Sequence, residues 1–78
     1  MDVKILGTGC PRCQRLEQLT REAAEELGVP IEVEHVRDVA RIMAYPVIGT
    51  PALVVDGTVR ASGRMPSKTE IASWLQPG

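Results

Sequence analysis

The stretch "GTGCPRCQRLEQL", residues 7–19, places Cys10 and Cys13 between a short apolar segment and a charged one. These are the two cysteines of the 78-residue chain. A disulfide between them is geometrically feasible. It would close so short a loop, however, that it would remove little entropy from the unfolded chain. A close pair of this kind is more often reactive or metal-binding than a structural crosslink.

The residues around the pair predict a strand followed by a helix. Residues 3–6 are apolar and stop at Gly7, as a short buried strand does. Pro11 is favoured at the first position of a helix. Apolar and small residues then recur at spacings of three and four, at Cys13, Leu16, Thr20, Ala23 and Leu27. The cysteines are therefore expected at the start of an amphipathic helix that ends near Gly28.

The rest of the chain predicts two further helices and three further strands. Residues 31–36 alternate apolar and polar side chains and predict a strand. Asp38 is a candidate N-cap for a short helix to about residue 45, with Val39, Ile42 and Met43 facing inward.

Asp56-Gly57 predicts a tight turn between strands at residues 53–55 and 58–61. The sequence "SKTE", residues 67–70, is a capping box for a last helix whose buried face is Ile71, Trp74 and Leu75. The expected order is β-α-β-α-β-β-α.

Composition predicts one small domain, residues 1–78, with an aliphatic core. The chain is 44% hydrophobic but contains no Phe, and its formal net charge is −1. Acidic and basic residues are interspersed, so we expect neither nucleic acid nor a membrane as a partner. The first residues lack the long apolar region of a secretory signal. We therefore expect a cytoplasmic protein, in a compartment where structural disulfides are rare.

The position of the cysteines favours dithiol chemistry. A helix N-terminus carries about half a positive charge, which favours a thiolate at Cys10. Arg12 adds a full positive charge nearby. Cys10 is expected at the mouth of the helix, within reach of an incoming disulfide, whereas Cys13 shares the inner row with Leu16. We therefore assign Cys10 as the nucleophile and Cys13 as the resolving thiol.

A metal carrier is the alternative from a different class. Two thiolates suit copper or zinc, but a structural zinc site needs four ligands and His35 is distant in the sequence. We interpret His35 as a half-exposed packing residue. Small copper chaperones also place C-x-x-C after a first strand, but with a Met where this chain has Thr8. We expect no metal site, and a non-catalytic copper or zinc carrier remains the alternative from an opposing class.

A second landmark is Thr50-Pro51 at the head of the third strand, where a proline is tolerated. With "CPRC", "GTPALVVDG" and "SGRMPS", the chain resembles the thioredoxin-fold superfamily, and in particular the small, minimal thioredoxins and glutaredoxin-like redox-active disulfide proteins of archaea and bacteria. The resemblance implies an α/β fold with a four-stranded mixed sheet in the order 2-1-3-4 and helices on both faces. It also implies a cis bond at Pro51, beside the cysteines, and substrate contacts from Thr50.

The same resemblance implies a function. It is that of a thiol-disulfide oxidoreductase, acting as a monomer without a cofactor, that reduces protein disulfides and receives electrons from a thioredoxin-reductase-type donor. Pro11, directly after the first cysteine, is also typical of glutaredoxins. Their Gly-Gly-Asp type of glutathione contact is not evident in "SGRMPS", but a glutathione-linked reductant is the nearer of the two alternatives.

Overall fold

A computed structural model of the chain describes residues 1–9 and 11–76. Its elements follow one another as β1 (Asp2–Leu6), α1 (Pro11–Leu27), β2 (Glu32–Val36), α2 (Val39–Met43), β3 (Ala52–Val55), β4 (Thr58–Ser62) and α3 (Lys68–Leu75). This is the order that the sequence predicts. Within the described ranges, no helix combines the length and the apolar character that crossing a membrane would require.

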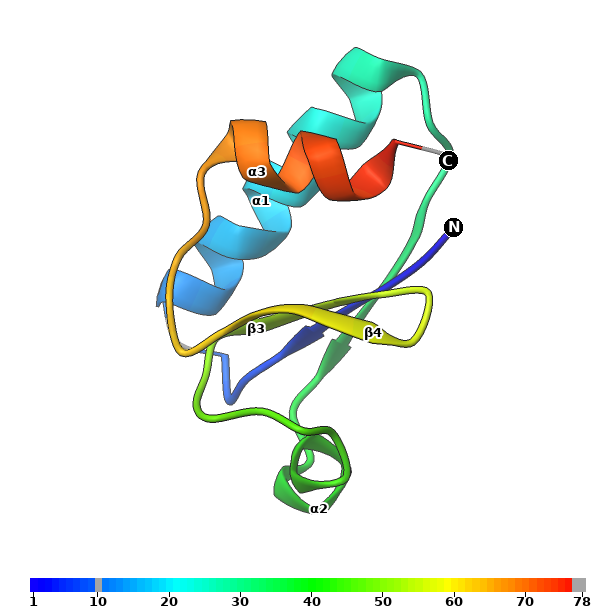
Figure 1. The fold of residues 1–78 in the computed structure, drawn as a ribbon. Coiled ribbons are helices and arrows are strands. Elements are labelled where there is room, and N and C mark those ends of the chain that lie inside the picture. Colours follow the sequence, from blue (N-terminus) through cyan, green and yellow to red (C-terminus); the bar gives the residue numbers. More distant parts are fainter. Residues whose placement is uncertain (10, 77–78) are drawn as a thin grey trace.

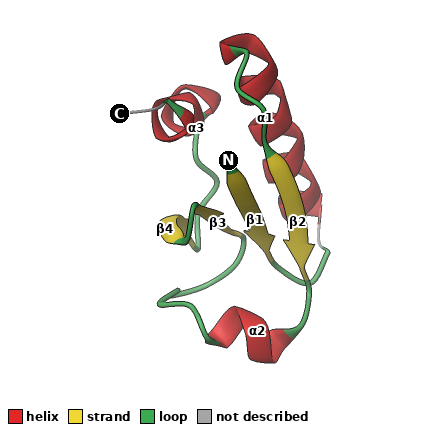
Figure 2. Ribbon diagram, turned by 90° about the vertical axis from the view of Figure 1, so that its right-hand side faces the viewer, coloured by secondary structure: helices red, strands yellow, loops and turns green. Residues whose placement is uncertain are grey.

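The strands form one mixed sheet in the order β2-β1-β3-β4, as predicted. β1 runs parallel to β2 and antiparallel to β3, and β3 runs antiparallel to β4. Leu6, the last residue of β1, is aligned with Val36 on one side and with Ala52 on the other. The end of β1 therefore meets the end of β2 and the start of β3 at one edge of the sheet (Figure 2).

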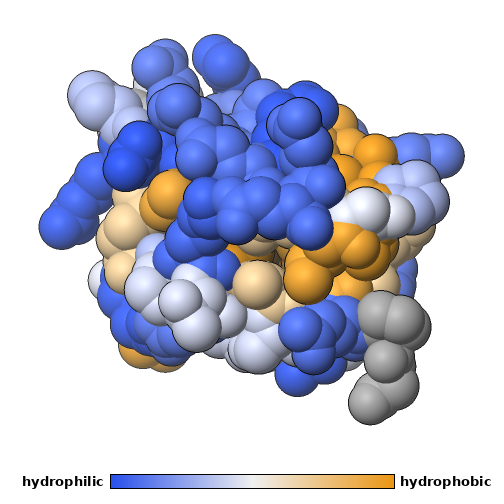
Figure 3. Space-filling model, turned by 90° about the horizontal axis from the view of Figure 1, so that it is seen from above, coloured by the Kyte–Doolittle hydropathy of each residue, from blue (hydrophilic) through white to orange (hydrophobic). Residues whose placement is uncertain are grey.

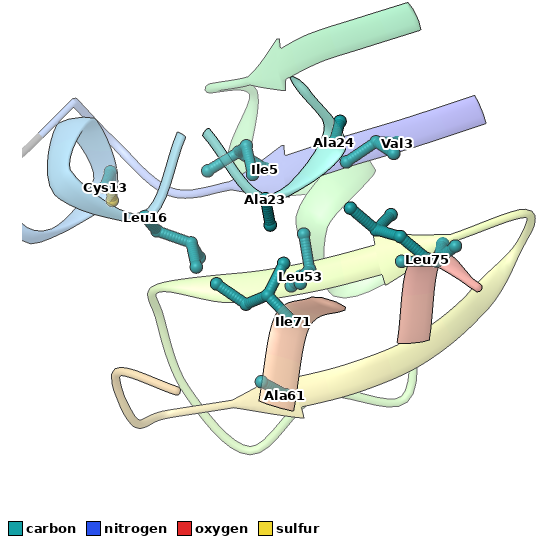
Figure 4. Packing of buried hydrophobic residues seen from close by; sticks show 11 residues of the cluster. Val3, Ile5, Cys13, Leu16, Ala23, Ala24, Leu53, Ala61, Ile71 and Leu75 are labelled. Atoms are coloured by element: carbon teal, nitrogen blue, oxygen red, sulfur yellow. The ribbon is translucent and has the colours of Figure 1, made fainter. Parts of the chain in front are cut away.

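Helices cover both faces of the sheet, which confirms the predicted architecture. α1 and α3 lie together on one face, and α2 lies on the other (Figures 1 and 2). Between the sheet and α1 and α3 is the larger core, built from aliphatic side chains such as Ile5, Leu53 and Ile71 (Figure 4). A smaller cluster on the α2 face contains Leu6, Val54 and Ile42. The fully buried members of both clusters are aliphatic apart from Cys13, and Trp74 and Tyr45 pack against them partly buried.

The first helix begins and ends where its sequence signals predict. Pro11 is its first residue, and Gly28, with a φ of 69°, follows its last residue. The buried row contains Cys13, Leu16, Thr20, Ala23 and Ala24. Leu27, predicted to continue this row, is 36% exposed at the end of the helix.

The short helix α2 differs in part from its prediction. Asp38 caps it by accepting a hydrogen bond from the Ala40 N–H at 2.9 Å. Ile42 is buried, but Val39 is 58% exposed and Met43 76% exposed. The prediction of an inward face at these two residues is wrong because the helix is little more than one turn long. Tyr45 and Val47, which follow the helix, pack partly buried against the cluster on that face of the sheet.

The C-terminal half contains the predicted hairpin and capping box. Asp56 and Gly57 have φ values of 48° and 83°, the left-handed pair that a tight two-residue hairpin turn requires. Ser67 Oγ accepts a hydrogen bond from the Glu70 N–H, and the Glu70 carboxylate accepts one from the Ser67 N–H, each at 3.1 Å. Trp74, predicted to be buried, is only partly so.

Candidate active site at the start of the first helix

Cys13 lies in the first turn of α1 and is completely buried. It is a member of the larger core and, with Leu16, extends that core toward the start of the helix (Figure 4). This placement agrees with the shielded position that the helix periodicity predicts. Cys10, its predicted partner, lies outside the described residues, so its role as nucleophile remains a prediction.

Gly7 lies between Cys13 and Thr50, which is in the segment before β3. Its N–H donates to the Val36 carbonyl at 3.0 Å, which extends the pairing of β1 and β2 by one residue. A Cβ at this position would overlap the sulfur of Cys13 and would lie 3.9 Å from Cβ of Thr50. The space between the first turn of α1 and Thr50 therefore admits only glycine at position 7, and a larger residue would displace one of these two neighbours. Sequence analysis identified Gly7 as the end of a strand and missed this packing role.

The Thr50–Pro51 peptide bond is cis, the isomer that the resemblance implies. Pro51 is buried and Thr50 is exposed, and β3 begins immediately after them at Ala52. Ala52 is aligned with Leu6 in the antiparallel register. Pro51, just before β3, and Gly7, just after β1, therefore lie at the same end of these two strands. The structure thus brings Cys13, Thr50 and Pro51 together at the end of β1.

Ser62, at the end of β4, fixes the loop that leads into Thr50. Its hydroxyl accepts a hydrogen bond from the Ile48 N–H at 2.7 Å and donates one to the Gly49 carbonyl at 3.3 Å. These two bonds hold the backbone of Ile48 and Gly49, and the apolar side chain of Ile48, two residues before Thr50, is 92% exposed. Sequence analysis did not single out Ser62 or Ile48, because neither forms part of a local motif.

Two arginines lie beside the cysteine motif. Arg12 is exposed in the first turn of α1, a turn that contains no acidic residue. The guanidinium of Arg37 lies against Gly9: a Cβ on Gly9 would be 3.0 Å from Arg37 Nη1. Sequence analysis missed Arg37, although a signal existed. Residues that follow neighbouring parallel strands meet at the same edge of a sheet, and Arg37 follows β2 as Gly9 follows β1.

His35 is largely buried between β2 and α1. Its ring is 13% exposed, and Nδ1 lies 3.6 Å from the Glu17 carboxylate. Nε2 is buried without a hydrogen-bond partner among the described residues. This arrangement agrees with a packing role, but the side chain is more buried than the half-exposed position that we predicted. Across residues 1–9 and 11–76, no three His, Cys, Asp or Glu side chains gather as a metal site would require.

Comparison with known proteins identifies the family. A family model described as a thioredoxin domain matches residues 1–76. The chain belongs to the thioredoxin family. A thioredoxin of Methanothermobacter thermautotrophicus strain Delta H is 42% identical over 75 residues, covering 96% of this chain and 97% of that protein. A thioredoxin of Methanocaldococcus jannaschii is 36% identical over 74 residues, covering 95% of this chain and 85% of that protein. The chain is thus a thioredoxin-like redox protein, as its resemblance implied.

Proposed function

We propose that the chain is a thiol-disulfide oxidoreductase that reduces protein disulfides through Cys10 and Cys13. The observation that carries the proposal is the placement of Cys13, buried in the first turn of α1 and packed against Gly7 beside Thr50. A thiol in this position is shielded from external substrates, but in the sequence it is only three residues from Cys10. That division suits an attacking thiol and a resolving thiol.

The reaction requires two exchanges. The thiolate of Cys10 attacks one sulfur of the substrate disulfide, forms a mixed disulfide and releases the other substrate sulfur as a thiolate. The Cys13 thiolate then attacks the Cys10 sulfur of the mixed disulfide and releases the second substrate thiolate. Two electrons have passed to the substrate, the released thiolates take up two protons, and Cys10 and Cys13 are left as a disulfide. A thioredoxin-reductase-type donor returns the two electrons.

Thr50, Pro51 and Arg12 form the proposed substrate-binding surface. Thr50 is exposed, and its main chain can pair with an extended peptide in the manner of an added strand. Ile48, whose backbone is held by Ser62 and whose side chain is exposed, adds an apolar contact on the same segment. Arg12, exposed in the first turn of α1, supplies a positive charge beside the reacting sulfurs. We further propose that the protein acts as a monomer in the cytoplasm.

Trapping of substrates tests the assignment of the two thiols. The Cys13→Ser variant should accumulate a mixed disulfide with a protein substrate, because the resolving thiol is missing, whereas Cys10→Ser should not. Non-reducing electrophoresis after incubation with oxidised insulin measures both. Equal trapping by the two variants would overturn the assignment of roles.

Insulin reduction tests the activity itself and separates it from metal transfer. The wild-type chain should accelerate the reduction of insulin by dithiothreitol, and the double variant Cys10→Ser/Cys13→Ser should not. Purified protein is assayed in parallel for retained copper and zinc. Metal retention without insulin reduction would replace the proposal with a carrier function. Reduction that depends strictly on glutathione and its reductase would replace it with a glutaredoxin-like one.

A further inference from the structure

The guanidinium of Arg37 lies against Gly9, the residue that directly precedes the proposed nucleophile in the sequence. Arg37 follows β2, and Gly9 directly precedes Cys10 in the sequence. A Cβ on Gly9 would lie 3.0 Å from Nη1 and 3.3 Å from Cζ of Arg37, so the guanidinium rests on the backbone of Gly9. Gly9 has a φ of 92°, a conformation that also favours glycine. Residue 9 thus leaves room for the arginine.

Arg37 has no carboxylate partner among the described residues, whereas five of the other lysines and arginines have one. Of the chain's nine lysines and arginines, the following pair with a carboxylate: Lys4, Arg21, Arg41, Arg64 and Lys68. The other four are Arg12, Arg15, Arg37 and Arg60. Three of these four lie beside the cysteine motif, and Arg60 lies on β4.

The acidic residues near the motif are directed elsewhere. Asp38, next to Arg37, points its carboxylate at the N-terminus of α2, where it accepts from Ala40. The first turn of α1 contains no acid. Further along α1, Glu17 pairs with Arg21, while Glu22 and Glu26 pair with Lys68 of α3. This side of the molecule, over α1 and α3, is mainly hydrophilic (Figure 3). Although the formal charge of the chain is −1, Arg12, Arg15 and Arg37 thus have no paired carboxylate among the described residues beside the motif.

We propose that Arg37 is a specificity-determining residue, which with Arg12 and Arg15 directs the dithiol toward disulfides flanked by carboxylates. This inference rests on the proposed function and names its substrate class. Arg37 neither gains nor loses electrons in the exchange. It attracts a carboxylate next to the disulfide as Cys10 attacks. For groups about 6 Å apart in water, Coulomb attraction changes the rate about threefold per charge.

The test compares three small disulfides that differ in charge. These are 3,3′-dithiodipropionate (a dianion), 2-hydroxyethyl disulfide (neutral) and cystamine (a dication). The second-order rate constant of the pre-reduced protein is measured for each disulfide at low ionic strength. The rate constants for the two charged disulfides are then divided by the rate constant for the neutral one. Arg37→Gln should lower the anion-to-cation rate ratio about threefold to tenfold, and Arg37→Lys should restore most of it. Added salt should reduce the wild-type ratio toward that of Arg37→Gln.

Arg60→Gln is the matched control, because it removes the same charge from an exposed arginine on β4 that also lacks a partner among the described residues. It should leave the rate ratio unchanged. If Arg37→Gln and Arg60→Gln have the same ratio while the wild-type chain reduces all three disulfides, the inference is wrong and the proposed function stands. If the reduced wild-type chain reacts with none of them, both are overturned.

A second pair of substrates identifies the source of the carboxylates. Glutathione disulfide is compared with a disulfide-linked peptide that carries a Glu on each side of its cysteine. An effect of Arg37→Gln on the peptide assigns the site to acidic protein segments, and an effect on glutathione disulfide alone assigns it to glutathione. An effect on neither contradicts recognition of carboxylates by Arg37.

Discussion

The sulfur of Cys13 lies against the backbone of Gly7 so closely that residue 7 has no room for a methyl group. Gly7 directly follows β1, and Cys13 lies in the first turn of α1. Both are buried, so neither can relieve an overlap by moving into solvent. The contact therefore fixes the distance between the helix that carries the cysteines and the sheet beneath it.

Replacement of Gly7 by alanine should move α1 or distort the Cys13 side chain. We expect Gly7→Ala to lower the free energy of unfolding by about 1–3 kcal/mol, the usual cost of overpacking a core. It should also slow insulin reduction several-fold. Urea denaturation and the insulin assay measure the two effects.

Gly28→Ala is the control for this experiment. Gly28 has a φ of 69° and open space where a Cβ would lie, so alanine should cost about 1 kcal/mol through backbone strain alone. The rate of insulin reduction should not change. Wild-type stability and activity in Gly7→Ala would show that the contact with Cys13 is looser than described.

Removal of the Ser62 hydroxyl should loosen the loop before Thr50. Ser62→Ala loses the hydrogen bonds to the Ile48 N–H and the Gly49 carbonyl, each worth about 1 kcal/mol. We expect lower stability and a higher KM for insulin, with a smaller change in kcat. Ser73→Ala removes a hydroxyl that donates to the Glu70 carbonyl at 2.6 Å in α3, and it should not alter KM. An equal KM for the two variants would argue against a role for the loop in substrate binding.

Replacement of His35 by leucine should stabilise the protein. The buried Nε2 atom lacks a hydrogen-bond partner among the described residues, and a desolvated polar group of this kind costs about 1–3 kcal/mol. Leucine keeps most of the packing volume and removes that cost, so His35→Leu should raise the free energy of unfolding by about 1 kcal/mol at pH 7. Glu17→Gln removes the carboxylate near Nδ1, and the exposed ion pair with Arg21, but does not change the surroundings of Nε2, so it should bring no such gain. A loss of stability in His35→Leu would mean that the ring nitrogen has a partner in solution.

Acid should weaken the start of α3. The Arg64 guanidinium, together with the Ser67 backbone N–H, lowers the pKa of Glu70 from 4.5 to about 2. Because this pKa is lower in the folded state, the carboxylate stabilises the fold fully above pH 4.5, and the contribution is lost as the pH falls toward 2. Glu70→Gln should therefore be less stable than wild type at pH 7.

The stability difference between wild type and Glu70→Gln should shrink from pH 4.5 to pH 2, as measured by urea denaturation across that range. Glu25→Gln, which alters an exposed carboxylate of α1 that pairs with no described cation, should follow the wild type throughout. A difference between wild type and Glu70→Gln that does not depend on pH would contradict the assignment.

Local signals in the sequence were sufficient for the order and bounds of most elements. Pro11 began a helix, Asp56-Gly57 made the hairpin turn, and Ser67 with Glu70 capped the last helix, because each depends on interactions between residues close in the chain. The inward face predicted for α2 failed at Val39 and Met43, since periodicity does not say how much of a short helix the sheet will cover.

The sequence by itself determined the dithiol motif, the fold class and the position of Cys13 on the inner face of α1. Only the tertiary structure decided which distant residues surround the motif. Arg37 reaches Gly9 because two parallel strands end at one edge, and Ser62 reaches Ile48 because β4 ends beside the loop before β3. Such contacts depend on how strands are paired, and pairing is set by the packing of the whole sheet rather than by neighbours in the sequence.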